Sequence, residues 1–318
     1  MKKIRNAFIF STILVLAACT AACAVPVHPE AGTTGAAFLK IGLGARPASM
    51  GEAFSAVADD IYAIYWNPAG LIQFEGTQIT GTHAEWFQNI RHEFIAFSSP
   101  LSKDLVFAMS IFGLYMTDLE KRSWSFEAPE ADPTSPESKF ASYDIAGTAA
   151  CGYKFSEKFN AGIGLKVIYE RIDDYNAWDF AADIGGIYRP WADNLQFGLV
   201  VQNIGPKLKF IEKSYWLPVN LKFGTAFRIP EWNFLLALDI NQSIDDYMTI
   251  DLGAEEKITE FLALRAGYKY KWFGNDLGAL SGLTAGIGFK LYGYHLDYGF
   301  APYGDLGLTH RISFTIVF

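Results

Sequence analysis

The chain has 318 residues, a net charge of −8 and a pI near 5.2. This acidic balance argues against nucleic-acid binding, which needs a basic surface. Charged residues make up 19% of the chain and aromatic residues 16%, whereas an average soluble domain has roughly 25% charged residues. Such a composition, rich in Gly, is typical of a transmembrane β-barrel with aromatic girdles at both membrane interfaces. An aromatic-rich soluble sandwich or propeller is the alternative.

Residues 1–24 are predicted to be a secretory signal peptide. A positively charged start precedes an apolar stretch, 7–18, that is too short to span a bilayer. Two processing sites are readable. Residues 22–24 form an A-x-A site, and residues 16–19 resemble a lipobox that would leave a lipidated Cys19. Ordinary cleavage is favoured, because a barrel needs no lipid anchor. No later apolar run is long enough for a membrane-spanning helix.

Residues 25–76 do not alternate in hydropathy. Small residues, short helical stretches and turn signals predict a compact hatch, or plug, inside a barrel. A wide barrel needs one, because side chains alone cannot fill its lumen. Within the hatch, Asn67 and Pro68 are expected to initiate a turn, followed by Ala69 and a helix-capping Gly70.

Two adjacent carboxylates precede this turn. Asp59 and Asp60 are expected either to cap a helix beginning near Ile61 or to pair with lumen cations such as Lys222 and Arg265. For the whole segment, packing and anchoring of the hatch are favoured over direct contact with a ligand.

From about residue 77 the chain consists of alternating segments of about ten residues, the length at which a tilted strand crosses a bilayer. Their number, fourteen, is even, as single-chain bacterial barrels require. The fold class is therefore all-β: a 14-stranded antiparallel transmembrane β-barrel over 77–318 with an N-terminal hatch. The predicted strands are 77–86, 90–98, 105–116, 142–155, 159–171, 178–189, 194–204, 219–229, 233–243, 248–258, 261–272, 282–292, 294–303 and 308–318.

The final strand carries the signature of barrel closure. Phe314, Ile316 and Phe318 share one face and end the chain on an aromatic residue, as expected of a strand that closes a barrel against the first one. Elsewhere the apolar faces often end in Tyr or Trp, and the opposite faces carry charges that we expect to point into the lumen. These charges are Lys166, Asp183, Arg189, Arg228, Asp239, Glu255, Arg265, Lys269 and Arg311.

Connection lengths predict the orientation. Long connections, 117–141, 205–218 and 273–281, follow odd-numbered strands, whereas the longest after an even-numbered strand is 99–104. Because outer-membrane barrels have long external loops and short periplasmic turns, we expect a location in the cell outer membrane, with both termini periplasmic. The Pro-, Ser- and Glu-rich loop 117–141 is expected to be solvated, and a partner-binding loop is the alternative.

The hatch segment also resembles a known family. Residues 38–42, 45–46, 50–54 and 58–71 look like the PorV/PorQ family of outer-membrane proteins, and Asn67-Pro68-Ala69 more distantly resembles the hatch turn of FadL-type fatty-acid transporters. The resemblance implies a FadL-like barrel with a hatch. It also implies a role in type IX secretion, in which PorV-like proteins dock on the translocon, receive cargo and pass it to the surface-attachment machinery.

Few residues point to catalysis or to a cofactor. Residues 42–44 begin like a dinucleotide-binding loop, but Pro47 stands where that motif needs glycine. His83, Glu85 and His92 could share a metal ion across the first hairpin, although structural histidines are favoured. The acidic pairs at 173–174 and 245–246 could bind calcium weakly, and turn formation is favoured.

His295 and Asp297 are expected to lie close together facing the lumen, but no companion serine is evident. We therefore expect no enzyme activity, no cofactor and no metal. The favoured function is docking and shuttling in type IX secretion, with passive transport of hydrophobic small molecules as the alternative. The expected partners are outer-membrane lipid, the barrel assembly machinery, and either a translocon with its cargo or a hydrophobic ligand.

Overall fold

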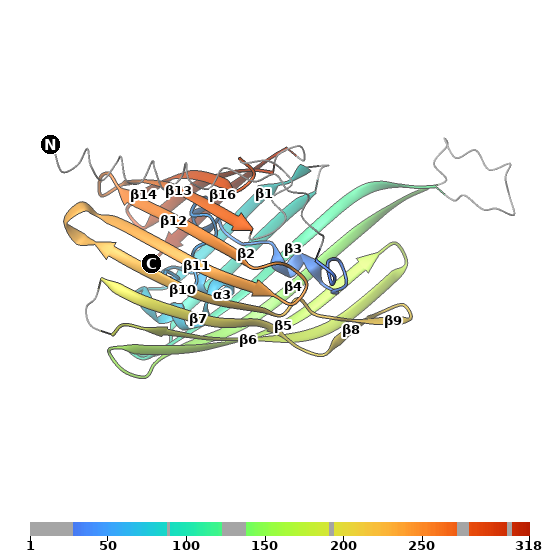
Figure 1. The fold of residues 1–318 in the computed structure, drawn as a ribbon, viewed down its shortest axis with the longest axis horizontal. Coiled ribbons are helices and arrows are strands. Elements are labelled where there is room, and N and C mark those ends of the chain that lie inside the picture. The colour runs from blue at the N-terminus through green and yellow to red at the C-terminus, as the bar shows by residue number, and fades with distance from the viewer. Residues whose placement is uncertain (1–27, 88–89, 123–137, 191–193, 272–279, 304–306) are drawn as a thin grey trace, which may run out of the picture.

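The protein is a closed barrel of fourteen antiparallel strands with an N-terminal segment inside it, so the predicted fold class is confirmed (Figure 1). The computed structural model describes residues 28–87, 90–122, 138–190, 194–271, 280–303 and 307–318. The barrel closes where β1 pairs with β16, from Gln78 opposite Val317 to Glu85 opposite His310. Closure leaves no open sheet edge, which a hydrocarbon environment would not tolerate.

The strand bounds follow the predicted segments closely. The wall strands are β1 (Gln78–Glu85), β2 (Arg91–Pro100), β3 (Leu105–Lys121), β4 (Ser138–Lys154), β5 (Phe159–Ile172), β6 (Tyr175–Tyr188), β7 (Leu195–Ile204), β10 (Asn220–Ile229), β11 (Phe234–Ser243), β12 (Thr249–Lys257), β13 (Leu262–Lys271), β14 (Leu283–Leu291), β15 (Tyr294–Pro302) and β16 (Leu308–Val317).

The loop predicted over 117–141 is strand at both ends. After a bulge between Met116 and Leu119, β3 and β4 continue to pair as far as Lys121 opposite Ser138. The pair therefore extends farther from the barrel than its neighbours (Figure 1). Residues 123–137, the centre of this predicted loop, lie outside the described residues, as do the signal peptide and most of the predicted connection 273–281.

The predicted loop 205–218 instead contains a hairpin. Strands β8 (Lys207–Phe210) and β9 (Lys213–Trp216) pair with each other outside the barrel sheet, so β7 neighbours β10 in the wall. Leu208 is buried and Lys207 and Lys209 are exposed, a short alternation. A further helical turn, η4 (Pro230–Trp232), joins β10 to β11.

The two ends of the barrel differ. We call the end with the β3–β4 and β7–β10 connections the long-loop mouth, and the other end the short-turn mouth. His28 contacts Tyr247, which joins β11 to β12 at the long-loop mouth, whereas the Phe318 amide bonds the Thr77 carbonyl at the short-turn mouth. The described residues therefore begin and end at opposite mouths, and the predicted periplasmic orientation of both termini stays a prediction, because residues 1–27 lie outside the described residues.

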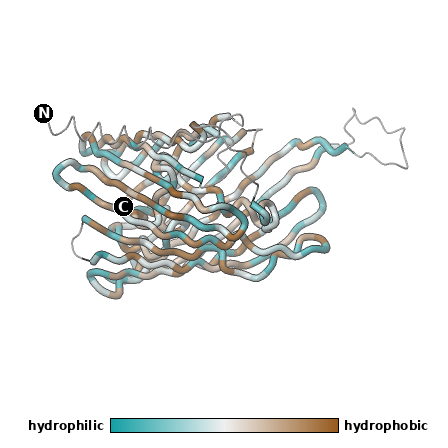
Figure 2. The backbone as a smooth tube through the Cα atoms, viewed as in Figure 1, coloured by the Kyte–Doolittle hydropathy of each residue, from teal (hydrophilic) through white to brown (hydrophobic). Residues whose placement is uncertain are grey.

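Hydropathy follows the strands: apolar stretches lie along them and polar residues gather at their ends (Figure 2). Outward-facing side chains such as Ile95, Ile111 and Phe180 are about 60% exposed. Inward-facing charges such as Lys166 and Asp183 are buried. Apolar side chains outside and charges inside are the reverse of the arrangement in a soluble protein, and they are typical of a barrel that faces lipid. Among the described residues no helix has the length and apolar character needed to cross a membrane.

Candidate functional site

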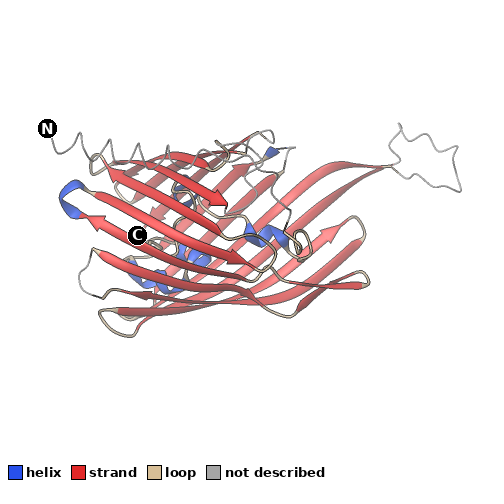
Figure 3. Ribbon diagram, viewed as in Figure 1, coloured by secondary structure: helices blue, strands red, loops and turns tan. Residues whose placement is uncertain are grey.

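The hatch, residues 28–76, passes through the lumen from the long-loop mouth to the short-turn mouth. Its helices are short: η1 (Ala37–Lys40), α2 (Ala45–Ser49), α3 (Ala63–Trp66) and η2 (Pro68–Gln73). Figure 3 shows them enclosed by the strands of the wall. None of these helices is long enough to be stable alone, so the hatch owes its shape to contacts with the wall and to its own core.

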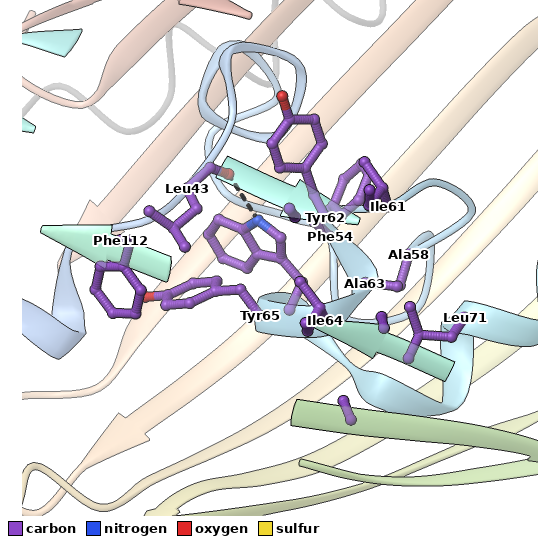
Figure 4. Packing of buried hydrophobic residues seen from close by; sticks show 14 of the residues in the cluster. Leu43, Phe54, Ala58, Ile61, Tyr62, Ala63, Ile64, Tyr65, Leu71 and Phe112 are labelled. Carbon is purple, nitrogen blue, oxygen red and sulfur yellow. Dashed lines mark hydrogen bonds between the residues drawn. The ribbon is translucent and has the colours of Figure 1, made fainter. Parts of the chain in front are cut away.

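Trp66 is the centre of that core. It is fully buried, and its indole Nε1 donates to the Leu43 carbonyl at 2.9 Å (Figure 4). Phe54 and Tyr65 pack edge-on against the indole, with ring centroids 6.2 and 5.0 Å away. Such aromatic packing adds to the burial of apolar area. Three separate parts of the hatch are thereby joined around one side chain.

The predicted turn residues fasten the hatch to the wall. The Asn67 amide donates to the carbonyls of Ser55 and Gly186, at 2.8 and 3.2 Å, and its carbonyl oxygen accepts from the Ala69 amide at 3.1 Å. Asn67 is thus the N-cap of η2, with Pro68 at the first helical position. Gly70 lies inside η2, where a Cβ would stand 2.1 Å from the Ala58 carbonyl oxygen, so it permits close packing.

A belt of lumen-facing glycines receives the hatch backbone. A Cβ on any of them would stand 2.0 to 2.8 Å from a hatch atom. Several belt members face each other across strand pairs, as Gly152 faces Gly162 and Gly253 faces Gly267. At these positions the hatch therefore lies directly against the backbone of the wall, with no wall side chain between them. The belt comprises Gly152, Gly162, Gly185, Gly198, Gly224, Gly253, Gly267, Gly286 and Gly299.

The hatch has an aromatic side, which faces β2 and β3. Tyr62 lies against Phe94 with ring centroids 5.6 Å apart, and Phe38 and Tyr65 lie 5.4 and 6.2 Å from Phe112. Phe94 and Phe112 are almost completely buried. The hydroxyl of Tyr62 also bonds Thr80 and Thr82 of β1. This side is held mainly by apolar burial.

The opposite, ionic side faces β10 to β15 and centres on Arg46. Its guanidinium lies 2.6 Å from Asp59, 2.7 Å from Asp60 and 2.7 Å from Glu255 of β12. Glu255 also contacts Arg265, at 2.6 Å. Since buried charges need partners, this network fixes α2 and the end of the 46–60 segment against the wall.

The cation partners of the two hatch aspartates differ from those predicted. Asp59 pairs with Arg46 and with Arg228 of β10, at 2.9 Å, rather than with Lys222 or Arg265. Asp60 pairs with Arg46, and its carboxylate accepts from the Tyr62 amide at 3.0 Å, whereas the N-cap of α3 is Tyr62, which has no side-chain capping bond. The prediction looked for cation partners on the barrel wall. It therefore did not identify Arg46, which lies within the hatch itself.

Burial and charge act differently on these carboxyls. Burial raises the pKa of Asp60 to about 6, against the lowering effect of Arg46. Burial would also raise the pKa of Asp59, but Arg46 and Arg228 hold it below its usual value. Burial likewise opposes ionisation of Glu52, yet the charges of Lys269, Arg311 and Lys222 lower its pKa to about 2.

Two cavities with charged residues in their lining flank the hatch on its ionic side. The cavity at the short-turn mouth has a volume of ≈ 660 Å³ and is lined by Arg46, Asp60, Glu255 and Arg265, among others. The cavity at the long-loop mouth has a volume of ≈ 100 Å³ and is lined by residues including Lys222. The transport hypothesis predicted an apolar pocket between hatch and wall, and these cavities are lined by charged and apolar groups together.

An apolar hollow of ≈ 680 Å³ lies on the outer wall, over β1 to β4 and β16. Gly81 and Gly113 leave room for it, because neither has a side chain. Ile95, Ile111 and Phe314 line it, and Phe94 and Phe112 are also among its lining residues, although their side chains are buried on the lumen side of the same strands. The hollow and the aromatic side of the hatch therefore lie on opposite faces of the same part of the wall.

The structure does not bring together the residues of the other candidate sites. His83 faces outward and bonds Glu93 at 2.7 Å, whereas His92 is buried in the lumen. Asp245 pairs with Lys40 and Asp297 with Arg265. In the described part of the chain, no three His, Cys, Asp or Glu residues lie close enough together to hold a metal ion.

The C-terminal residues occupy the seam of the barrel. On β16, Phe314 faces Gly81 of β1 and Ile316 faces Ile79. Phe314 is nearly half exposed on the outer wall, and Phe318 follows the strand with its side chain exposed. These placements put an apolar stripe along the outside of the closing strand pair.

Several solved structures have a similar fold. The toluene transporter TodX of Pseudomonas putida has a TM-score of 0.62 and 15% identity, covering 87% of this chain and 96% of that one. A TodX monoaromatic hydrocarbon channel mutant, deltaS2, has a TM-score of 0.66 and 15% identity, covering 87% and 99%. A Pseudomonas aeruginosa FadL homologue has a TM-score of 0.59 and 12% identity, covering 86% and 98%.

No family model and no curated protein matches the chain. The comparisons therefore bear out the FadL-like part of the resemblance, at the level of the fold, and give no support to the PorV/PorQ part. The fold is that of FadL-like outer-membrane barrels.

Proposed function

We propose that the protein is a passive, non-enzymatic transporter of hydrophobic small molecules across an outer membrane. The observation that carries this proposal is the pairing of the outer hollow with the aromatic side of the hatch. Phe94 and Phe112 are among the lining residues of the hollow, and their rings contact the aromatic side of the hatch. The shared architecture with the toluene transporter TodX supports it.

The route follows the aromatic side. An apolar solute entering at the long-loop mouth, which we assign to the outside, would pass the rings around Phe112 and leave through the wall where Gly81 and Gly113 thin it. The β1–β2 and β2–β3 ladders are continuous, so the structure represents a closed state. Opening requires a shift of the hatch or of the wall near the β3 bulge beyond Met116.

Uptake of radiolabelled toluene by cells tests this function, in a host that lacks its own FadL-type transporter. We expect faster uptake with the protein than without it. Gly81→Leu and Gly113→Leu fill the hollow and should slow uptake severalfold. Gly147→Leu is the matched control, because Gly147 faces outward on β4 and a Cβ there would meet nothing within 4 Å. Uptake no faster than in cells without the protein would refute the proposal.

Docking in type IX secretion stays a prediction. The extended β3–β4 pair offers a surface for a protein partner, but none of the structural comparisons supports that role.

A further inference from the structure

The two cavities on the ionic side of the hatch are close to each other. Lys269 of β13 lines the long-loop cavity, and Arg265 of the same strand lines the short-turn cavity. At about 3.3 Å per residue, these positions are only about 13 Å apart along the strand. Between them lies Gly267, a member of the glycine belt, and on β12 its partner Gly253.

One turn of the hatch separates the cavities. The backbone of Met50 and Gly51 rests directly on Gly253 and Gly267. The hydroxyl of Thr284 on β14 holds this turn, because it accepts from the Gly51 amide at 2.9 Å and donates to the Ser49 carbonyl at 3.0 Å. Apart from the buried Met50 side chain, the contact is made of backbone and hydrogen bonds, and water can replace these hydrogen bonds at little cost.

The aromatic side lacks this property. Opening a gap there would expose Phe94, Phe112 and Tyr62, all of which are buried against apolar neighbours. Exposing such rings costs free energy in proportion to their apolar area. Water is consequently expected to enter beside the hatch on the ionic side first.

The lining of the long-loop cavity is already suited to water. Lys222 is 5% exposed, and its ammonium lies 4.4 Å from the centroid of the Trp66 ring without an ion pair in the described part of the chain. Asn241 is 7% exposed, and its Oδ1 has no hydrogen-bond partner there. Buried polar groups of this kind are normally satisfied by ordered water.

We propose that the ionic side of the hatch is a gated passage for water and small ions, closed by the Ser49–Gly51 turn. This activity is separate from transport of apolar molecules along the aromatic side. The charges that line the passage have both signs, with Arg46, Lys222 and Lys269 near Glu52 and Glu255. Small ions of either sign are therefore admitted.

Ion conductance of the purified protein in planar lipid bilayers containing potassium chloride tests the proposal. Thr284→Val keeps the shape of the side chain and removes both hydrogen bonds to the turn, so we expect the open time to rise about tenfold. The matched control is Thr80→Val, which removes a hydroxyl bonded to Tyr62 on the aromatic side. We expect its open time to equal that of the unmodified protein.

A second variant locates the current. In the Thr284→Val background, Lys222→Gln removes a positive charge from the passage, so the reversal potential under a salt gradient should shift towards cation selectivity. An unchanged reversal potential would show that the current runs elsewhere and overturn the proposal. Equal open times in Thr284→Val and Thr80→Val would overturn it as well. Toluene uptake is measured separately, so each activity can fail without the other.

Discussion

The aromatic and ionic sides of the hatch are held by different forces. Around Phe112 the hatch and wall exclude water and are joined by apolar burial. Around Arg46 they are joined by ion pairs beside a cavity of ≈ 660 Å³. Apolar contacts resist hydration, whereas the hydrogen bonds of the Ser49–Gly51 turn beside these ion pairs can be exchanged for water. One plug can therefore be firmly attached on one side and easily hydrated on the other.

The largest expected effect comes from the aromatic side. Phe112→Ala deletes a ring that is 1% exposed and contacts both Phe38 and Tyr65. We expect it to lower the free energy of unfolding by about 3–5 kcal/mol, measured by denaturant titration in detergent. Ile111→Ala, the adjacent outward-facing residue, is the control and should change little. Equal losses in both variants would show that the hatch contributes nothing to the stability of this wall.

The ionic side should respond less. Arg46→Ala leaves Asp59, Asp60 and Glu255 without their shared cation, and we expect a loss of about 3 kcal/mol by the same titration. Arg228→Ala is the control. That side chain is 32% exposed and pairs with Asp59 at 2.9 Å, so we expect a loss below about 1 kcal/mol. A larger effect at Arg228 would contradict the central role of Arg46.

The glycine belt contacts the hatch on both sides. A third comparison is between a belt glycine and a glycine that faces outward. A Cβ at Gly162 would stand 2.2 Å from the Pro68 carbonyl carbon, so Gly162→Ala should displace the Asn67–Pro68 turn. We expect a loss of about 1–3 kcal/mol and faster protease cleavage within the hatch. Gly147→Ala on the neighbouring strand meets nothing within 4 Å. Cleavage at the same rate in both variants would show that the belt does not seat the hatch.

Local patterns in the sequence predicted the wall well. The segment predicted at 219–229 is β10 within one residue, because side chains of a strand alternate between two faces with a fixed period. The first strand was harder to recognise from its hydropathy. Its outward face carries Gly81, His83 and Glu85, so burial alternates while hydropathy does not.

Contacts between the hatch and the wall were not predictable in the same way. Arg46 and Glu255 are 209 residues apart in sequence, and no local pattern specifies which lumen charge meets which hatch charge. A usable signal was nevertheless present. Glycines recur on the polar faces of the strands, as Gly224 and Gly286 do, and mark where the hatch backbone touches the wall.

The smallest expected effect is a pH dependence confined to the ionic side. The pKa of Asp60 is raised from 3.8 to about 6 by burial. The fold therefore favours the protonated carboxyl, and the stability that this group contributes is complete below about pH 4 and is lost as the pH rises through about 6. The change amounts to no more than about 2 kcal/mol, given a shift of about two pKa units in a partly exposed group.

Asp60→Asn removes the titration, so the difference in unfolding free energy between variant and unmodified protein should change between pH 4 and 6 and be constant above that range. Glu75→Gln, which alters an exposed carboxylate of the same hatch segment, controls for the loss of one charge. Parallel pH profiles for Asp60→Asn and the unmodified protein would show that Asp60 stays ionised in the fold. In that case Arg46 outweighs burial at both aspartates, and the ionic side has no protonation-dependent component at Asp60.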